Sequence, residues 1–142
     1  GNFSGPLAAG GAVVTAVESD GDAFADLEDL VARAGGRIHA IKADAAKWVR
    51  RAAEAGERFD AVLLDPPRPG AKGLAPWIAR LAPETVVFVS CDPSTLARDL
   101  GAFRRHGYET TAVRPYDFFP QTYHVETLSV LARSSQEPAS GD

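Results

Sequence analysis

The chain has 142 residues, of which 45% are hydrophobic and 24% are charged, and its formal net charge is −4. This length supports one domain with a hydrophobic core, and the balance excludes a disordered or fibrous protein. The negative charge argues against a strong nucleic-acid footprint, and the single cysteine excludes an internal disulfide.

Strand and helix patterns alternate along the chain. Residues 1–6 (GNFSGP) predict the end of a glycine-rich loop that enters a helix. The next expected elements are a strand at 12–18, a helix at 22–34, a strand at 37–42, a helix at 44–55 and a strand at 59–64. They are followed by a helix at 74–81, a strand at 85–90, a helix at 94–105, and strands at 108–115 and 126–132 as an antiparallel pair.

This alternation predicts an α/β fold with a mostly parallel sheet and helices on both faces. We expect residues 1–133 to form one domain, and the polar tail 134–142 to be disordered. No apolar run is long enough to cross a membrane and no signal peptide is visible, so we expect a cytoplasmic protein with no membrane partner.

Chemically active residues follow several of the predicted strands, where open α/β sheets bind their ligands. Glu18 ends a strand and is typical of an acid that accepts hydrogen bonds from ribose hydroxyls, although it is equally a charge flanking a helix. In the run Asp65-Pro66-Pro67-Arg68, two prolines lock an extended turn and project the carboxylate outward. Methyltransferases of exocyclic base nitrogens have an aromatic residue where Arg68 stands, which weakens that interpretation.

Cys91 lies between the strand at 85–90 and a helix that opens with Pro93. Unpaired helix N–H groups at this position would favour the thiolate, which is the nucleophilic form. The alternative is that Cys91 is a small buried hydrophobic residue.

Aromatic residues gather in the segment 116–126 (YDFFPQTYHVE), where they either stack on a base or pack against the sheet edge. His124 and Glu126 share one face of a strand, so one is a candidate proton carrier. If the substrate is RNA, a local basic patch could contact its phosphates. The candidate residues are Arg98, Arg104, Arg105 and His106, for which a solvated helix face is the alternative.

The chain resembles the RNA (uracil-5-)-methyltransferase family, whose members use S-adenosylmethionine. The matching runs are GNFS (1–4), AVE (16–18), FDAVLLDPPRPGA (59–71), VSCDPSTLARDL (89–100) and FFPQTYHVETLSVLAR (118–133). The resemblance implies a Rossmann-like class I methyltransferase sheet, S-adenosylmethionine as the cofactor, and transfer or ribosomal RNA as the partner. No metal site is expected.

The resemblance also implies roles for single residues. Cys91 matches the nucleophile that adds to carbon 6 of the target uracil, and Glu126 matches the base that removes the carbon 5 proton. The positions that match the cofactor site are Asn2, Glu18 and Asp65, with Asp44 near the adenine. Arg68 and His124 are candidates for substrate binding. Addition of the thiolate to the uracil would form an enolate, and Arg68 is a candidate donor to its oxygen.

The chain also departs from the family. Members are longer and carry upstream segments, whereas this sequence starts inside the cofactor motif, after the strand that normally lies at the centre of the sheet. We therefore expect a fragment with unpaired strand edges and weak or absent activity in isolation. Gly21-Asp22-Ala23-Phe24 replaces an asparagine-containing pattern of many members.

Three other functions are compatible with these residues. The first is a methyltransferase acting on another base atom, with Cys91 structural. The second is a thiol hydrolase that uses Cys91 and His124. The third is a non-catalytic RNA-binding module, against which the net charge of −4 argues.

Overall fold

The computed structural model describes residues 2–117 and 125–134, which form parts of two units, Gly1–Arg51 and Ala52–Asp142. One catalytic domain over residues 1–133 therefore stays a prediction. The tail expected at 134–142 lies, apart from Ser134, outside the described residues.

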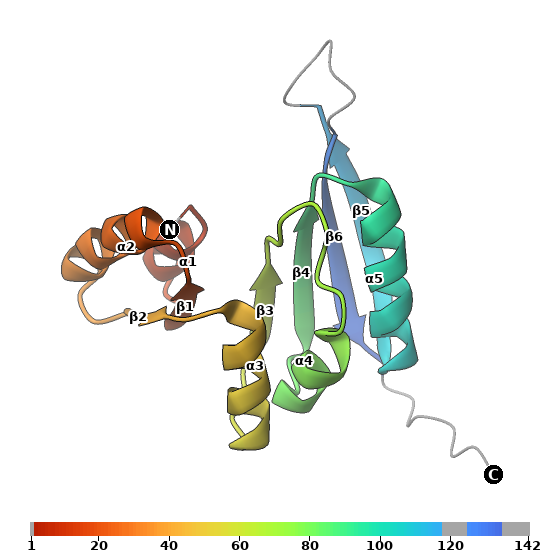
Figure 1. Cartoon of the computed structure of the whole chain (residues 1–142), viewed down its shortest axis with the longest axis horizontal. Coiled ribbons are helices and arrows are strands. Elements are labelled where there is room, and N and C mark those ends of the chain that lie inside the picture. Colours follow the sequence, from red (N-terminus) through yellow and green to blue (C-terminus); the bar gives the residue numbers. More distant parts are fainter. Residues whose placement is uncertain (1, 118–124, 135–142) are drawn as a thin grey trace. The chain divides into compact units, whose positions relative to one another are not determined.

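The first unit packs two helices against a parallel pair of strands. Its elements are α1 (Ser4–Ala9), β1 (Val14–Glu18), α2 (Gly21–Arg33) and β2 (Ile38–Lys42) (Figure 1). The strands pair from Val14 opposite Ile38 to Glu18 opposite Lys42, and Ala8, Leu27 and Ile38 form the buried core. The strand expected at 12–18 begins two residues later because the Ala12 amide donates to the Leu7 carbonyl in a turn. Helix α3 (Ala45–Glu54) contains the boundary between the units.

The second unit is a four-stranded mixed sheet with the strand order β3-β4-β6-β5. Strand β6 runs antiparallel to both of its neighbours, while β3 and β4 are parallel, which confirms the predicted α/β class and the antiparallel C-terminal strand. The elements are β3 (Ala61–Leu64), α4 (Ala75–Leu81), β4 (Thr85–Ser90), α5 (Pro93–Arg105), β5 (Tyr108–Tyr116) and β6 (Glu126–Arg133).

Aromatic contacts fix α5 against this sheet. The rings of Phe88 on β4 and Phe103 on α5 meet edge to face with centroids 6.3 Å apart, and Phe103 and Tyr108 do so at 5.9 Å. The buried Tyr108 hydroxyl donates to the Pro83 carbonyl at 2.8 Å. Edge-to-face aromatic pairs add specific geometry to apolar burial, so the C-terminal part of α5 has a defined place against β4 and β5.

Four of the described strands, β1, β2, β3 and β5, have an open edge. Within residues 2–117 and 125–134, β1 pairs with β2 alone and β3 pairs with β4 alone. The expectation that a missing central strand leaves unpaired edges stays a prediction. No helix in the described part of the chain is long and apolar enough to span a bilayer.

Candidate active site

The register of two neighbouring strands, β4 and β6, determines where Cys91 and Glu126 lie. Ser90, the last residue of β4, lies opposite Thr127 of β6. Cys91 comes directly after Ser90, and Glu126 directly precedes Thr127 and pairs with Tyr116 of β5. Because the strands are antiparallel, Cys91 and Glu126 both adjoin the last pair of this ladder, at one edge of the sheet.

Asp65 lies at the same edge, one strand further along. It directly follows Leu64, which is the partner of Phe88 on β4. Asp65 is exposed overall, yet partial burial of its carboxyl raises its pKa above the usual 3.8. No hydrogen bond to this carboxylate occurs within the described residues, so it is a candidate ligand-binding group.

The surroundings of the thiol differ from the expectation. Cys91 is half-buried. The amides of Ser94 and Thr95, at the start of α5, donate to Asp92 Oδ1 at 2.9 and 3.0 Å. The helix N–H groups that we expected to face the thiol are therefore bonded to the Asp92 side chain, the N-cap of α5. A hydrogen bond from the Ser94 hydroxyl, assisted by these amide bonds, lowers the pKa of Asp92.

Arg68 follows Asp65 in a turn that contacts α5. The Gly70 amide donates to the Pro67 carbonyl at 2.8 Å, and the Thr95 hydroxyl donates to the Arg68 carbonyl at 3.1 Å. The Arg68 side chain is exposed, as a substrate-binding role requires.

Arg98 was considered part of a basic RNA-binding patch, but its guanidinium binds elsewhere. It donates to the Pro69 carbonyl at 2.7 Å and forms an ion pair with Asp99 at 2.9 Å. Sequence reasoning did not identify Asp99. Its spacing from Leu96 and Phe103 puts an acidic residue on the buried face of α5, and that was a usable signal.

In the first unit, Glu18 and Asp44 lie at the carboxyl edge of the two strands. Glu18 Oε1 accepts the amides of Ser19 and Asp20 at 2.7 and 2.8 Å, while Oε2 has no bond among the described residues. The Asp44 carboxylate accepts the Lys47 amide at 2.9 Å and so caps α3. Asn2 is exposed and precedes α1.

The structure thus places the predicted residues in two groups. Cys91, Glu126, Asp65 and Arg68 belong to the second unit, and Asn2, Glu18 and Asp44 to the first. His124 and the neighbouring aromatic residues at 118, 119 and 123 lie outside the described residues. Within the described residues, no cluster of three His, Cys, Asp or Glu side chains is arranged to hold a metal ion.

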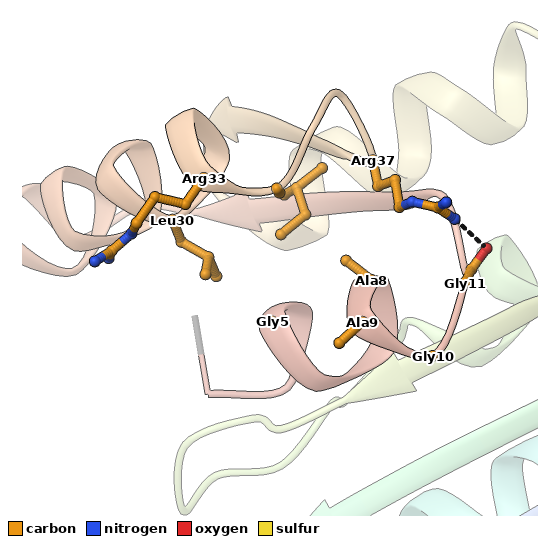
Figure 2. A pocket seen from close by; sticks show the side chains of 10 residues that line it. Gly5, Ala8, Ala9, Gly10, Gly11, Leu30, Arg33 and Arg37 are labelled. Atoms are coloured by element: carbon orange, nitrogen blue, oxygen red, sulfur yellow. Dashed lines mark hydrogen bonds between the residues drawn. The ribbon is translucent and has the colours of Figure 1, made fainter.

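A pocket of about 420 Å³ lies in the first unit. Figure 2 shows Arg37 above it, donating to the Gly11 carbonyl at 3.2 Å. Small residues of α1 and the turn after it, with Leu30 and Arg33 of α2, form much of the remaining wall. None of the predicted site residues lines this pocket, so it is not part of the candidate site.

Residues 53–134, more than half of the chain, match the family described as tRNA (Uracil-5-)-methyltransferase. The chain belongs to this family. The matched stretch contains Asp65, Cys91 and Glu126, which all lie at the edge described above. The uracil-5-methyltransferase resemblance noted in the sequence is confirmed.

Individual members are similar to this chain over different lengths. An RNA methyltransferase of Thermotoga maritima is 52% identical over 80 residues, which cover 56% of this chain and 18% of the relative. The 23S rRNA (uracil(1939)-C(5))-methyltransferase of Pseudomonas aeruginosa is 41% identical over 139 residues, covering 92% of this chain and 29% of the relative. The chain thus spans less than a third of the length of either relative.

A solved structure of a family member shares the fold. The crystal structure of Pyrococcus abyssi tRNA (uracil-54, C5)-methyltransferase in complex with S-adenosyl-L-homocysteine matches with a TM-score of 0.78 and 30% identity. The match covers 93% of this chain and 32% of that one. It confirms the predicted Rossmann-like class I methyltransferase fold.

Proposed function

We propose that this protein transfers a methyl group from S-adenosylmethionine to carbon 5 of a uridine in RNA, through a covalent bond between Cys91 and the uracil. One observation carries the proposal. In a chain of the uracil-5-methyltransferase family, the pairing of Ser90 with Thr127 brings the sole cysteine and Glu126 to one edge of the sheet.

The proposed chemistry needs both side chains. The Cys91 thiolate adds to carbon 6 of the uracil, and the electrons of the carbon 5–carbon 6 double bond form an enolate that makes carbon 5 nucleophilic. S-adenosylmethionine, when bound, supplies the methyl group that carbon 5 accepts. Glu126 then takes the proton from carbon 5, the double bond re-forms, and Cys91 leaves as the thiolate.

Two further groups assist in this scheme. Arg68, exposed on the turn after Asp65, donates to the enolate oxygen, where negative charge develops. His124 is proposed to contact the substrate. Because a base stacked in a helix is out of reach, the target uridine is flipped out or lies in a loop.

The residues assigned to the cofactor fit its chemistry. Glu18 keeps one carboxylate oxygen for ribose hydroxyls, which are donors, while its other oxygen is held by two backbone amides. Asp65 has a carboxylate without a described partner, and Asn2 has an exposed amide side chain. Asp44 contributes near the adenine through the oxygen that does not cap α3.

The proposed substrate class is transfer or ribosomal RNA. The two relatives named for their substrates are a 23S rRNA and a tRNA methyltransferase, so they agree on RNA uracil and differ in the RNA. We place the protein in the cytoplasm, whose reducing conditions keep a catalytic thiol free.

The first test uses the complete protein that carries this chain, S-adenosylmethionine and RNA containing 5-fluorouridine. Fluorine at carbon 5 is not removed as a proton, so the covalent protein–RNA adduct accumulates and survives denaturation. We expect a shifted band whose RNA-linked peptide contains Cys91, and no band with Cys91→Ala.

Asp60→Asn is the control, since Asp60 is exposed before β3 and outside the proposed site. It is expected to form the adduct as the unchanged protein does. Methyl transfer to RNA without any adduct would contradict the thiolate route and favour another target atom. A burst of acyl-enzyme without any need for S-adenosylmethionine would instead favour the thiol hydrolase.

A further inference from the structure

The turn that carries Arg68 is bonded to helix α5 at three of its residues, Arg68, Pro69 and Ala71. The Thr95 hydroxyl donates to the Arg68 carbonyl at 3.1 Å, and Arg98 Nη2 donates to the Pro69 carbonyl at 2.7 Å. Two residues further along the turn, the Ala71 amide donates to Asp99 Oδ2, also at 2.7 Å. These bonds join segments 27 to 29 residues apart in the chain.

Asp99 is the buried centre of this arrangement. Only 3% of its surface is exposed, and its two oxygens accept Arg98 Nε at 2.9 Å and Nη2 at 3.0 Å as well as the Ala71 amide. Neighbouring residues on a helix do not normally face each other. Arg98 and Asp99 pair here because both side chains turn toward the same loop, and pairing is what makes a buried carboxylate tolerable.

Gly70 lets the turn approach the helix this closely. Its φ of +77° is in the left-handed region, which favours glycine. A Cβ at this position would collide with Asp99 Oδ2 and lie 2.6 Å from Arg98 Nη2. The turn and the ion pair therefore fit each other without room for a side chain.

The same helix begins beside Cys91. Thr95, which binds the Arg68 carbonyl, also donates to the Asp92 carbonyl at 3.2 Å. Asp92 directly follows Cys91 and caps α5. Helix α5 thus gives the thiol and the Asp65–Arg68 turn one common frame.

We propose that Asp99 and Arg98 are positioning residues, which hold the Asp65–Arg68 turn at the place where Arg68 meets the uracil bound to Cys91. This inference rests on the proposed function and adds to it a pair of residues that do not touch the substrate. Because small displacements of a catalytic group cost large factors in rate, loosening the turn should slow catalysis in a protein that remains folded.

The activity test compares Asp99→Asn, Arg68→Met and the double variant in the complete protein. Asparagine keeps an acceptor for the Ala71 amide but loses the charge that pairs with Arg98. We expect Asp99→Asn to lower kcat and the rate of 5-fluorouridine adduct formation by roughly 10- to 100-fold. If Asp99 acts through the turn, the double variant should be no slower than Arg68→Met alone.

Asp60→Asn is the matched control, with the same change of charge at an exposed residue of the same unit. We expect Asp60→Asn to leave kcat unchanged, both alone and when it is combined with Arg68→Met. A second pair, Arg98→Met and Arg98→Lys, guards against misfolding of Asp99→Asn, and lysine is expected to restore part of the rate lost with methionine. Multiplicative effects of Asp99→Asn and Arg68→Met, or no difference between lysine and methionine, would overturn the positioning role.

Hydrogen exchange at the Ala71 amide tests the contact itself without any activity. We expect exchange at least tenfold faster in Arg98→Met than in Asp60→Asn, because the carboxylate that binds this amide loses its partner. Unchanged exchange would overturn the inference even if methyl transfer is as proposed. An unchanged protein that neither methylates RNA nor forms the adduct would refute the proposed function, and with it the positioning role, while faster exchange would still establish the contact.

Discussion

Glu126 has one task in the proposed reaction, the removal of the carbon 5 proton after methylation. It is half-buried at the start of β6, and it directly precedes Thr127, the partner of Ser90. Glu126→Gln cannot take this proton, so we expect turnover to fall by about 10²–10⁴-fold. Because the earlier steps do not need the carboxylate, a methylated protein–RNA adduct should accumulate with ordinary uridine.

A denaturing gel with methyl-labelled cofactor measures this adduct. Glu109→Gln is the matched control, since Glu109 is exposed on β5 and outside the site. It should turn over normally without a persistent band. Normal turnover by Glu126→Gln would assign proton removal to another group.

Asp65 is expected to reduce stability while it serves function. Burial raises the pKa of its carboxyl above 3.8, so ionisation costs more in the folded protein than in the unfolded chain. The penalty is absent below about pH 3.8 and complete above the raised pKa. Asp65→Asn should therefore be more stable than the unchanged protein at pH 7, equally stable near pH 3.5, and weaker in methyl transfer.

Urea unfolding at the two pH values measures this difference. Asp60, at the opposite end of β3 from Asp65, has an exposed carboxylate, so Asp60→Asn should show no such pH-dependent gain. A loss of stability in Asp65→Asn at pH 7 would mean that the charged carboxylate is stabilised by a partner.

At the scale of elements, the N-terminus of α5 depends on Asp92. Its carboxylate accepts the amides of Ser94 and Thr95 and the Ser94 hydroxyl, which together lower its pKa below 3.8. A lowered pKa means that the charged cap stabilises the fold above pH 3.8, and that this stability is lost as the pH falls through the lowered value.

We expect Asp92→Ala to lower the melting temperature clearly at pH 7 and much less at pH 2.5, and Asp92→Asn, which is a neutral cap, to lower it at pH 7 by less than alanine does. Thermal unfolding followed by circular dichroism gives the comparison. An equal effect of alanine at both pH values would show that the charge of Asp92 does not matter for the cap.

Periodicity located the elements well but not their ends. The strand at 85–90 is observed as predicted, because β-branched residues and a full apolar run leave little choice. The strand expected at 59–64 starts at Ala61, since the Phe59 amide bonds to the Leu81 carbonyl at the end of α4. Such tertiary hydrogen bonds trim an element and leave no mark in its local pattern.

At the scale of the whole molecule, charge limits what the chain does with RNA on its own. With a net charge of −4, the 142-residue chain has no overall excess of positive charge to give non-specific affinity. We expect it to bind a short single-stranded RNA more weakly than about 10⁻⁶ M at physiological salt. Fluorescence anisotropy at two salt concentrations measures this.

Submicromolar binding that weakens steeply with salt would contradict the expectation and point to a local basic patch. Arg104, Arg105 and His106, exposed at the end of α5, are the residues to change in that case. The matched comparison is Arg33→Glu, which alters an equally exposed arginine of the first unit.

The sequence by itself determined the α/β class, the order of the elements and the family, because periodicity and long motifs are local properties of the chain. It also indicated Asp65, Cys91 and Glu126 as candidates. Only the tertiary structure decided that Cys91 and Glu126 adjoin the last pair of one ladder, that Asp92 accepts the helix amides, and that Asp99 and Arg98 bond to the Arg68 turn. The physical reason is that strand register and loop-to-helix hydrogen bonds join residues 27 to 47 positions apart, and no local pattern records which distant backbone group a side chain will meet.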